Sequence, residues 1–328
     1  MIRYIFRMFR YGFSYFIATI FFSKDIRQAV FTLYSFVRVP DNIVDVVDGG
    51  FDIKSTTIYC ENKECGFADT KNICTQRCRK MLLTHYLSAY KQLGEYYKKW
   101  NHAFHNKDRE DSQFGEYVRL FEAYAIPYEY STSFFQSMIS DCIVNRYQTY
   151  AEVEKYMYGS ASVIGLMMCS LMGVDNNRAL KYARILGDAM QFTNFLRDIH
   201  EDIVYLDRIY LPAQDLKKYG LDHEDIVAFS DDFARRDLKK WSAFQSYMKA
   251  QILFCRTLYR QAMKGYPYLS LEARKAVSLS SLLYQEILAK IEKNDYDVFS
   301  LSAKTSFWDK LMVWWRWKRT ISVSLIKM

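Results

Sequence analysis

The chain has 328 residues, half of them hydrophobic and 17% aromatic, and its formal net charge is +8 at pH 7. Only four Pro and 12 Gly interrupt it, which favours long helices, and the apolar content is enough for a large core with an apolar cavity. The positive charge suits anionic partners such as a diphosphate or an anionic membrane surface, whereas the lack of any nucleic-acid-binding motif excludes nucleic acid as an expected partner.

Residues 1–45 predict helices, because aromatic residues recur three and four positions apart and a helix start signal follows at Ser23. The basic, apolar beginning imitates a signal peptide, but no small-residue cleavage site follows it, so we expect this segment to belong to the fold. The sequence has no uninterrupted apolar run of about 18 residues, and no membrane-spanning helix is therefore expected.

A pair of carboxylates ends this first segment. Asp41 and Asp45 are four residues apart, which places them one turn above each other on a helix face, and Tyr34 and Arg38 precede them. Pro40 leaves two interpretations open. Either the helix continues and the carboxylates form a pair, or Pro40 begins a new helix and Asp41 is an ordinary anion at its N-terminus.

Residues 48–75 lose helical periodicity and predict a long loop after the first carboxylate pair. The chain has seven Cys, an odd number that predicts reduced thiols rather than a disulfide framework. A cysteine cluster in and after this loop does not have the spacing of a standard zinc motif, so loop thiols are the preferred interpretation and a structural zinc site is the alternative. Its members are Cys60, Cys65, Cys74 and Cys78.

The helical pattern resumes from about Gln76 to Trp100, breaks between Asn101 and Ser112, and then continues. Small residues crowd the later segment 156–168, and this fits close helix packing and space for a substrate chain equally well. They are Gly159, Ser160, Ala161, Ser162 and Gly165.

The most informative stretch covers residues 188–212, in a helix that we expect Gly187 to open. At helical period one face is polar, and Asp198 and Asp202 form a second carboxylate pair with Arg197 beside it. Such a like-charge pair costs roughly 0.2 to 0.5 kcal/mol unless something neutralises it. The other polar residues of this face are Gln191 and Asn194.

Two acidic helix faces, each with an adjacent guanidinium group, suit a diphosphate that is bound through Mg²⁺. Mg²⁺ prefers a few carboxylates together with phosphate oxygens, and Arg side chains bind the remaining oxygens in a bidentate manner. The sequence therefore predicts a metal-dependent diphosphate site formed by the two segments.

Residues 307–328 form a basic tail that holds four of the six Trp. This composition is typical of a helix that lies in a membrane interface, and packing on the domain is the alternative. The cations of the tail are Lys310, Arg316, Lys318, Arg319 and Lys327.

Four segments resemble, in this order, the squalene/phytoene synthase family, whose members join two prenyl diphosphates head to head. They are residues 14–45, 156–168, 191–212 and 282–299. The segment that begins at Gln191 is highly specific, and its wording is most similar to that of phytoene synthases, as in a bacterial phytoene synthase. The resemblance implies an all-α fold, a single-domain isoprenoid-synthase-type helical bundle over residues 1–328 around a central apolar cavity.

The resemblance also implies a role for each polar residue of the two faces. Mg²⁺, or Mn²⁺ in its place, would be held by Asp41, Asp45, Asp198 and Asp202. The substrate diphosphate would be bound by Ser14, Arg38 and Arg197. The reacting carbons and phosphates would also lie near Tyr34, Tyr156, Gln191, Asn194 and Tyr284. Core packing is the alternative for each tyrosine.

Three departures from the family pattern weaken phosphate binding. Asn42 stands where an acidic residue is usual, and Gly12 stands where a diphosphate-binding Ser is common. Leu301 and Ser302 stand where a basic residue often occurs, and Lys304 is the nearest cation. Both Asp pairs are kept, which argues against the alternative that the chain is a non-catalytic assembly or scaffold protein.

The implied activity is Mg²⁺-dependent condensation of two geranylgeranyl diphosphates to phytoene through a cyclopropyl diphosphate intermediate, without NADPH. The alternative is conversion of farnesyl diphosphate to squalene, which would require NADPH, or to dehydrosqualene. A terpene cyclase would have a different pair of metal motifs. We further expect a cytoplasmic protein that is peripherally bound at the inner face of the cell membrane, and the sequence leaves its oligomeric state open while favouring a monomer.

Overall fold

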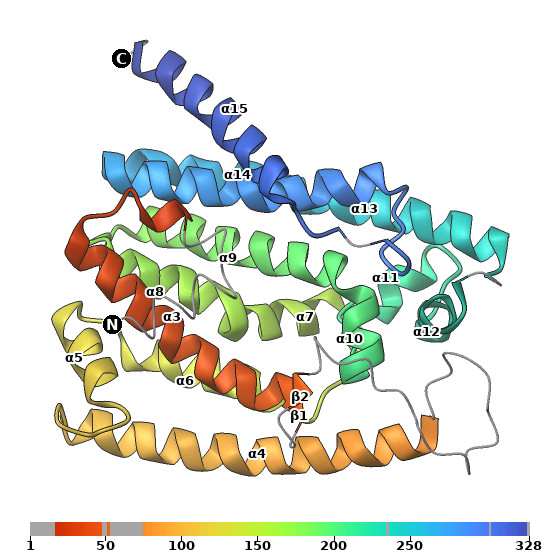
Figure 1. Cartoon of the computed structure of the whole chain (residues 1–328), viewed down its shortest axis with the longest axis horizontal. Coiled ribbons are helices and arrows are strands. Elements are labelled where there is room, and N and C mark those ends of the chain that lie inside the picture. Colours follow the sequence, from red (N-terminus) through yellow and green to blue (C-terminus); the bar gives the residue numbers. More distant parts are fainter. Residues whose placement is uncertain (1–16, 48–50, 53–74, 234–235, 302, 327–328) are drawn as a thin grey trace.

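The computed structural model describes residues 17–47, 51–52, 75–233, 236–301 and 303–326, and helices account for most of them (Figure 1). The elements, in chain order, are α3 (Lys24–Asp45), β1 (Val46–Val47), β2 (Phe51–Asp52), α4 (Thr75–His105), α5 (Gly115–Ala123), α6 (Tyr128–Ser140), α7 (Tyr150–Met157), the π-helix η2 (Tyr158–Ser162), α8 (Val163–Leu171), α9 (Asn177–Arg197), α10 (Ile199–Leu206), α11 (Ala213–Lys217), α12 (His223–Asp231), α13 (Leu238–Ala262), the 3₁₀-helix η4 (Met263–Tyr268), α14 (Leu271–Lys293) and α15 (Phe307–Ile326).

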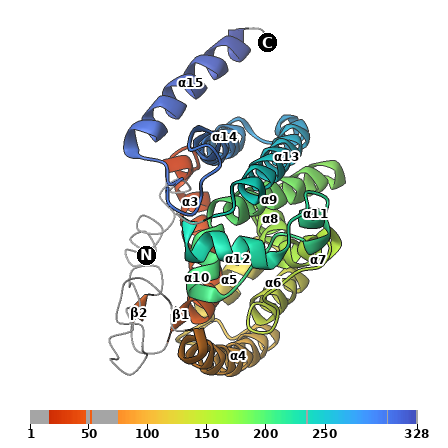
Figure 2. The same ribbon diagram turned by 90° about the vertical axis from the view of Figure 1, so that its right-hand side faces the viewer.

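The helices form a bundle with α9 at its centre. α9 packs against α13, α14, α8 and η2, while α3 packs against α4, α5, α6 and α8. In Figure 1, α13 and α14 form one edge of the bundle and α4 forms the opposite edge, and Figure 2 shows the same layers from the side. The described strands are the antiparallel two-residue pair β1 and β2, so the all-α prediction is confirmed.

Side-chain caps fix where several helices begin. Thr149 and Glu152 form a capping box at the start of α7, and the Asn176 side chain accepts two backbone N–H bonds at the start of α9. Each such cap contributes about 1 kcal/mol. The prediction that Gly187 opens the central helix is wrong, because Asn176 begins α9 well upstream and Gly187 lies inside it.

Two further expectations concern the residues at which α3 and α4 end. Pro40 lies inside α3, which continues to Asp45, so the alternative of a new helix at Pro40 is wrong. The buried Pro40 ring packs on the core face, which offsets part of the roughly 3 kcal/mol that proline costs inside a helix. α4 runs past its predicted end at Trp100 to His105, because Phe104 extends its packed face onto Phe121.

Aromatic packing anchors α3 in the bundle. The ring of Phe36 is fully buried, and its centroid lies 5.0 Å from that of Trp100 and 5.2 Å from that of Phe121. At helical period Phe36 lies on the face of α3 opposite to Tyr34 and Asp41. The core contact therefore turns the polar face of α3 towards the middle of the bundle.

Several predictions fall on residues outside the described ranges. They include most of the predicted loop 48–75, and they also concern Gly12, Ser14, Cys60, Cys65, Cys74 and the side chain of Cys78. Among the described cysteines, Cys142, Cys169 and Cys255 are free thiols. None of the described helices has the length and apolar character of a membrane span.

Two glycines provide a test of how closely α9 approaches η2. A Cβ atom on Gly187 would lie 2.6 Å from the backbone oxygen of Ala161, whereas one on Gly94 of α4 would meet no described atom within 4 Å. Alanine gains about 1 kcal/mol of helix propensity over glycine, and overpacking costs about 1 to 3 kcal/mol. We expect Gly94→Ala to stabilise the protein by about 1 kcal/mol and Gly187→Ala to destabilise it by a net of about 1 kcal/mol in urea unfolding. Equal gains at both positions would show that η2 moves away at no cost.

Candidate active site

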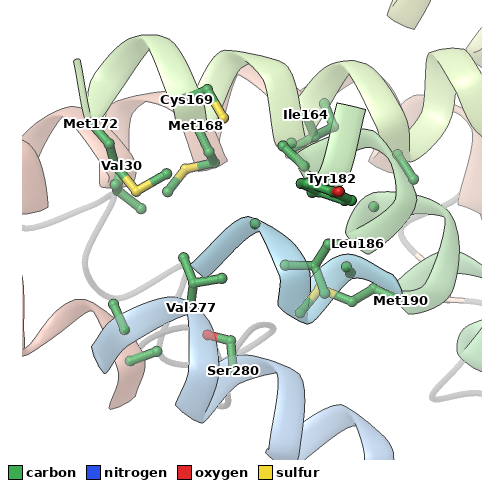
Figure 3. Close-up of a pocket in the computed structure, with 18 of the residues that line it drawn as sticks. Val30, Ile164, Met168, Cys169, Met172, Tyr182, Leu186, Met190, Val277 and Ser280 are labelled. Atoms are coloured by element: carbon green, nitrogen blue, oxygen red, sulfur yellow. The ribbon is translucent and has the colours of Figure 1, made fainter. Parts of the chain in front are cut away.

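An apolar cavity of about 310 Å³ lies along α9 and is walled by α3, α8 and α14. In Figure 3, Ile164 and Met168 of α8 lie above the cavity and Val277 of α14 lies below it, while Leu186 and Met190 of α9 lie on the right. Hydrocarbon and thioether groups dominate this lining, which suits a ligand with a long apolar part.

The lining becomes polar at one end. On α9 it runs from Ala179 to Gln191 and Asn194, and a rise of 1.5 Å per residue makes this distance about 22 Å. On α3 it runs from Val30 to Tyr34 and Val37. Just beyond these last lining residues, both helices carry the predicted Arg and Asp side chains, which are Arg38, Asp41, Asp45, Arg197 and Asp198. Three predicted site residues, Tyr34, Gln191 and Asn194, thus line the cavity at its polar end.

The first carboxylate pair lies at the C-terminal end of α3. Nη1 of Arg38 donates a hydrogen bond to Oδ2 of Asp41, and Oδ1 of Asp45 lies 3.7 Å from Nη1 of Arg208. A helix C-terminus carries partial negative charge and disfavours anions by a few tenths of a kcal/mol to about 1 kcal/mol. Both carboxylates accordingly lie beside a guanidinium group.

The second pair lies where α9 meets α10. Nε and Nη2 of Arg197 donate to Oδ1 and Oδ2 of Asp198 at 2.7 and 2.6 Å, and Asp202 follows in the first turn of α10. Burial disfavours the charged form of Arg197, but Asp198 outweighs burial and raises the pKa of Arg197, with Tyr284 of α14 acting in the same direction. The predicted residue Tyr284 is therefore close to this guanidinium, and its side chain is buried.

The four aspartates do not form a ready-made metal cage. Within the described ranges, no three His, Cys, Asp or Glu side chains converge in a way that could hold a metal ion. The donor chemistry nevertheless fits Mg²⁺, which takes oxygen ligands and few protein carboxylates. A further oxygen is available in Oδ1 of Asn194, which is buried one turn before Asp198 and has no hydrogen-bond partner among the described residues.

Tyr156 belongs to a buried hydrogen-bond network rather than to the cavity lining. Its hydroxyl donates to Oδ2 of Asp141 at 2.7 Å, and the hydroxyl of Tyr210 donates to Oδ1 at 2.9 Å. Nη2 of Arg208 donates to the backbone oxygen of Asp141 at 2.9 Å. Burial raises the pKa of Asp141 to about 6, so this carboxyl is ionised at neutral pH despite being enclosed.

This network connects three segments of the site. Arg208 follows α10, Asp141 follows α6, and Asp45 ends α3, so one guanidinium lies beside carboxylates from two other elements. Sequence reasoning gave no role to Asp141 or Arg208. The sequence does contain charged residues in the segments around Arg146 and Ile209. These two segments come together only in the fold, where Arg146 and Ile209 form a parallel backbone bridge. A buried carboxylate with a raised pKa beside a candidate site indicates a functional position.

Lys304 supplies a cation near the second carboxylate pair. Its Nζ lies 2.7 Å from Oε1 of Glu201 in α10, and Glu201 is among the groups that raise the pKa of Arg197. Leu301, which stands near the expected basic position, is exposed. Although Leu301 stands near the position expected to be basic, Lys304 therefore still provides a cation beside α10.

Sequence comparison identifies the family. The model of the squalene/phytoene synthase family matches residues 9–309. The chain belongs to this family. A 15-cis-phytoene synthase from Synechococcus elongatus is 37% identical over 194 residues, which cover 54% of this chain and 59% of that protein. A chloroplastic phytoene synthase from Narcissus pseudonarcissus is 38% identical over 177 residues, 52% of this chain and 40% of the relative. The matched region thus spans about three fifths or less of these two relatives.

Solved structures share the fold of this squalene/phytoene synthase family member. A dehydrosqualene synthase in complex with ligand superposes with a TM-score of 0.69 at 18% identity, covering 98% of this chain and 96% of the other. A squalene synthase from Alicyclobacillus acidocaldarius gives a TM-score of 0.64 at 17% identity, covering 87% and 89%. The predicted family and its isoprenoid-synthase-type helical fold are confirmed.

The buried carboxyl of Asp141 makes stability depend on pH. Its pKa is 3.8 in its ordinary state and about 6 in the fold, so between these values the unfolded chain releases its proton first and stability falls as the pH rises. Asp141→Asn should remove this fall in the free energy of unfolding with rising pH, which is on the order of 2 to 3 kcal/mol. The variant should also be at least as stable as the wild type at pH 7.5. Urea unfolding at about pH 4 and pH 7.5 measures both quantities. Asp188, whose pKa burial also raises to about 6, is present in both proteins and cancels.

Asp207→Asn is the matched control. Asp207 forms an ion pair of 2.6 Å with Arg146, both side chains are partly exposed, and its φ of 48° is one that Asn tolerates. This variant should change stability by less than about 1 kcal/mol at either pH. A large loss in Asp141→Asn at pH 7.5 would contradict the assignment, because it would mean that ionised Asp141 stabilises the fold through Arg208.

Proposed function

We propose that this protein is a prenyltransferase that joins two prenyl diphosphates head to head, converting two geranylgeranyl diphosphates to phytoene through a cyclopropyl diphosphate intermediate. One observation carries the proposal: α3 and α9 both pass from the apolar cavity directly into paired Arg and Asp side chains. A site with this polarity matches an amphiphile that has a long hydrocarbon tail and a multiply charged head.

The charged end can bind a diphosphate through both of its Arg residues. Arg38 and Arg197 offer guanidinium groups for bidentate hydrogen bonds to phosphate oxygens. Mg²⁺ or Mn²⁺ would be held by the two carboxylate pairs, with Asn194 as a further oxygen ligand, and these carboxylates are Asp41, Asp45, Asp198 and Asp202. When bound, the divalent cation supplies charge that stabilises the departing diphosphate.

The ion pairs at the two helix ends imply that diphosphate and cation bind cooperatively. The Arg38 and Arg197 guanidinium groups now donate to Asp41 and Asp198. A diphosphate would accept these hydrogen bonds instead and leave the two carboxylates to a cation. Either ligand alone would leave one set of partly buried charges without its partner, so each should raise the affinity for the other.

The neutral groups at the polar end of the cavity can guide the reacting carbons. Loss of diphosphate leaves an allylic carbocation, and the apolar walls keep water away from it. Tyr34 and Gln191 lie at the boundary between the cavity and the charged residues, where an aromatic face or an amide dipole can orient a cation without trapping it. Formation of phytoene ends with loss of a proton and therefore requires no reductant.

The metal ligands can be tested by removing one charge from each pair. We expect Asp41→Asn and Asp198→Asn to fold but to lower turnover of labelled geranylgeranyl diphosphate at least about a hundredfold, because a ligand carboxylate is lost. Asp175→Asn, an exposed change in the loop before α9, is the control and should be fully active. Activity that survives EDTA, or near-normal turnover in both site variants, would contradict the metal assignment.

The tail length can be tested from within the cavity. Geranylgeranyl diphosphate should give phytoene without NADPH, and Ala183→Phe, which adds a large side chain to the cavity lining on α9, should lower kcat/KM for it relative to farnesyl diphosphate at least about tenfold. Lys181→Phe, exposed on the same helix, controls for effects on α9 itself. Chromatography of the products decides the outcome. Squalene formed only with NADPH, or dehydrosqualene as the main product, would refute the phytoene assignment.

A further inference from the structure

The helix α15 is attached to the bundle by one face only. Val313 and Trp317 are buried against α14, and Nε1 of Trp317 donates to Oγ of Ser278 at 2.9 Å. At the start of the helix, Nζ of Lys290 lies 2.8 Å from Oδ2 of Asp309. Figures 1 and 2 show that α15 begins beside α14 and then extends beyond the bundle.

The opposite face of α15 is apolar and exposed. At helical period Trp308, Leu311 and Trp315 share this face, which we call the outer stripe, and Trp308 and Trp315 are 70% and 45% exposed. The exposed cations Lys318 and Arg319 border it, and Cζ of Arg319 lies 3.5 Å from the centroid of the Trp315 ring. Aromatic rings and cations are therefore combined on one surface.

The charge of this helix points to an anionic surface. The α15 sequence contains a single acidic residue, Asp309, and that carboxylate faces α14 in its ion pair with Lys290. Along the outer stripe, the side chains that the structure describes are consequently apolar or cationic. Trp and Lys or Arg in this arrangement are typical of helices that lie at the boundary between lipid headgroups and acyl chains.

A second copy of the chain is a less suitable partner for this surface. The core of a protein interface is depleted of Lys, and burying the outer stripe against protein would desolvate Lys318. A lipid surface accepts both, because the Trp rings reach the acyl boundary while the cations stay among the headgroups.

The attachment of α15 is also next to the cavity wall. The ring of Trp317 lies 5.0 Å from that of Phe21, whose neighbour Phe22 lines the cavity, and Ser278 adjoins the lining residue Val277. If the substrate is a prenyl diphosphate, as the proposed function holds, its apolar tail partitions into lipid. Docking through α15 would then bring the cavity wall close to the surface that holds the substrate.

We propose that α15 is a membrane-docking helix that lies in the interface of an anionic membrane through its outer stripe and holds the protein there as a peripheral membrane protein. Removal of residues 307–328 would be a poor test, because it would also remove Val313 and Trp317 from their packing on α14. Substitutions confined to the outer stripe leave that packing unchanged.

The test is sedimentation of the full chain with phosphatidylglycerol/phosphatidylcholine vesicles and with vesicles of phosphatidylcholine alone. We expect the wild type to bind the anionic vesicles, to bind more weakly as salt is raised, and to lose at least about tenfold in partition coefficient in the double variant Trp308→Ser/Trp315→Ser. The control is Leu87→Ser/Tyr90→Ser, which removes two exposed apolar side chains from α4 on the opposite edge of the bundle and should bind like the wild type.

Two further measurements separate this proposal from its alternatives. The outer-stripe variant should keep its activity on detergent-solubilised substrate, and light scattering without lipid should give the same molar mass for it as for the wild type. Equal vesicle binding by wild type and outer-stripe variant would overturn the proposal, and so would a wild-type dimer that this variant dissociates. Vesicle binding does not require turnover, so this experiment still tests the docking proposal if the protein does not catalyse the proposed reaction.

Discussion

The helices α3 and α9 both end at Asp side chains, although the C-terminus of a helix disfavours negative charge. The rest of the site is arranged around that constraint. Asp45 is the last residue of α3 and Asp41 lies one turn before it, and Asp198 follows the last residue of α9. Each would be destabilised by the carbonyl end of its helix without a cation nearby. Arg38, Arg197 and Arg208 supply that charge in the described structure. In the proposed function, a diphosphate and a divalent cation would together take over these partners and leave none of them alone.

The cavity follows from how closely α9 approaches its neighbours. Gly187 and Gly165 each lie where a Cβ atom would be 2.6 Å from a backbone oxygen of the facing element, so the helices meet at backbone distance at these two points. The π-helix η2 occurs at the same contact, and a π-turn inside an α-helix often accompanies a functional site. Between such contacts the small lining residues Ser160 and Ala161 leave space. Close packing and free volume are thus produced by the same run of small side chains, and Gly159, which packs on Ser137, serves the packing alone.

Local pattern was enough for the features that depend on local spacing. Helical periodicity predicted the two acidic faces, and their residues Tyr34, Gln191 and Asn194 do line the cavity. Helix boundaries were less well predicted. Gly187 was expected to open the central helix, but α9 begins at the Asn176 cap, which is a weaker local signal than a glycine. The contacts between Asp141 and Arg208 join residues 67 positions apart, and no periodicity reports such a distance. Tyr156 was predicted to lie near the reacting groups, but its hydroxyl is bound to Asp141, which only the three-dimensional arrangement reveals.

The position of Arg208 explains why an ionised carboxylate is kept inside the protein. Burial raises the pKa of Asp141, so the neutral form would be favoured if stability alone mattered, and a buried ion pair can often be replaced by apolar groups without loss. The ionised Asp141 carboxylate instead helps to hold Arg208 in a fixed position. The Arg208 guanidinium lies 3.9 Å from Oδ1 of Asp141 and 3.7 Å from Oδ1 of Asp45, and it is held by both. Because Arg208 lies two residues after the end of α10, its position fixes the spacing between the end of α3 and α10, which carry carboxylates of the two pairs. The network therefore acts on the candidate metal site through the distance between its two halves, at a cost in stability that a neutral residue would avoid.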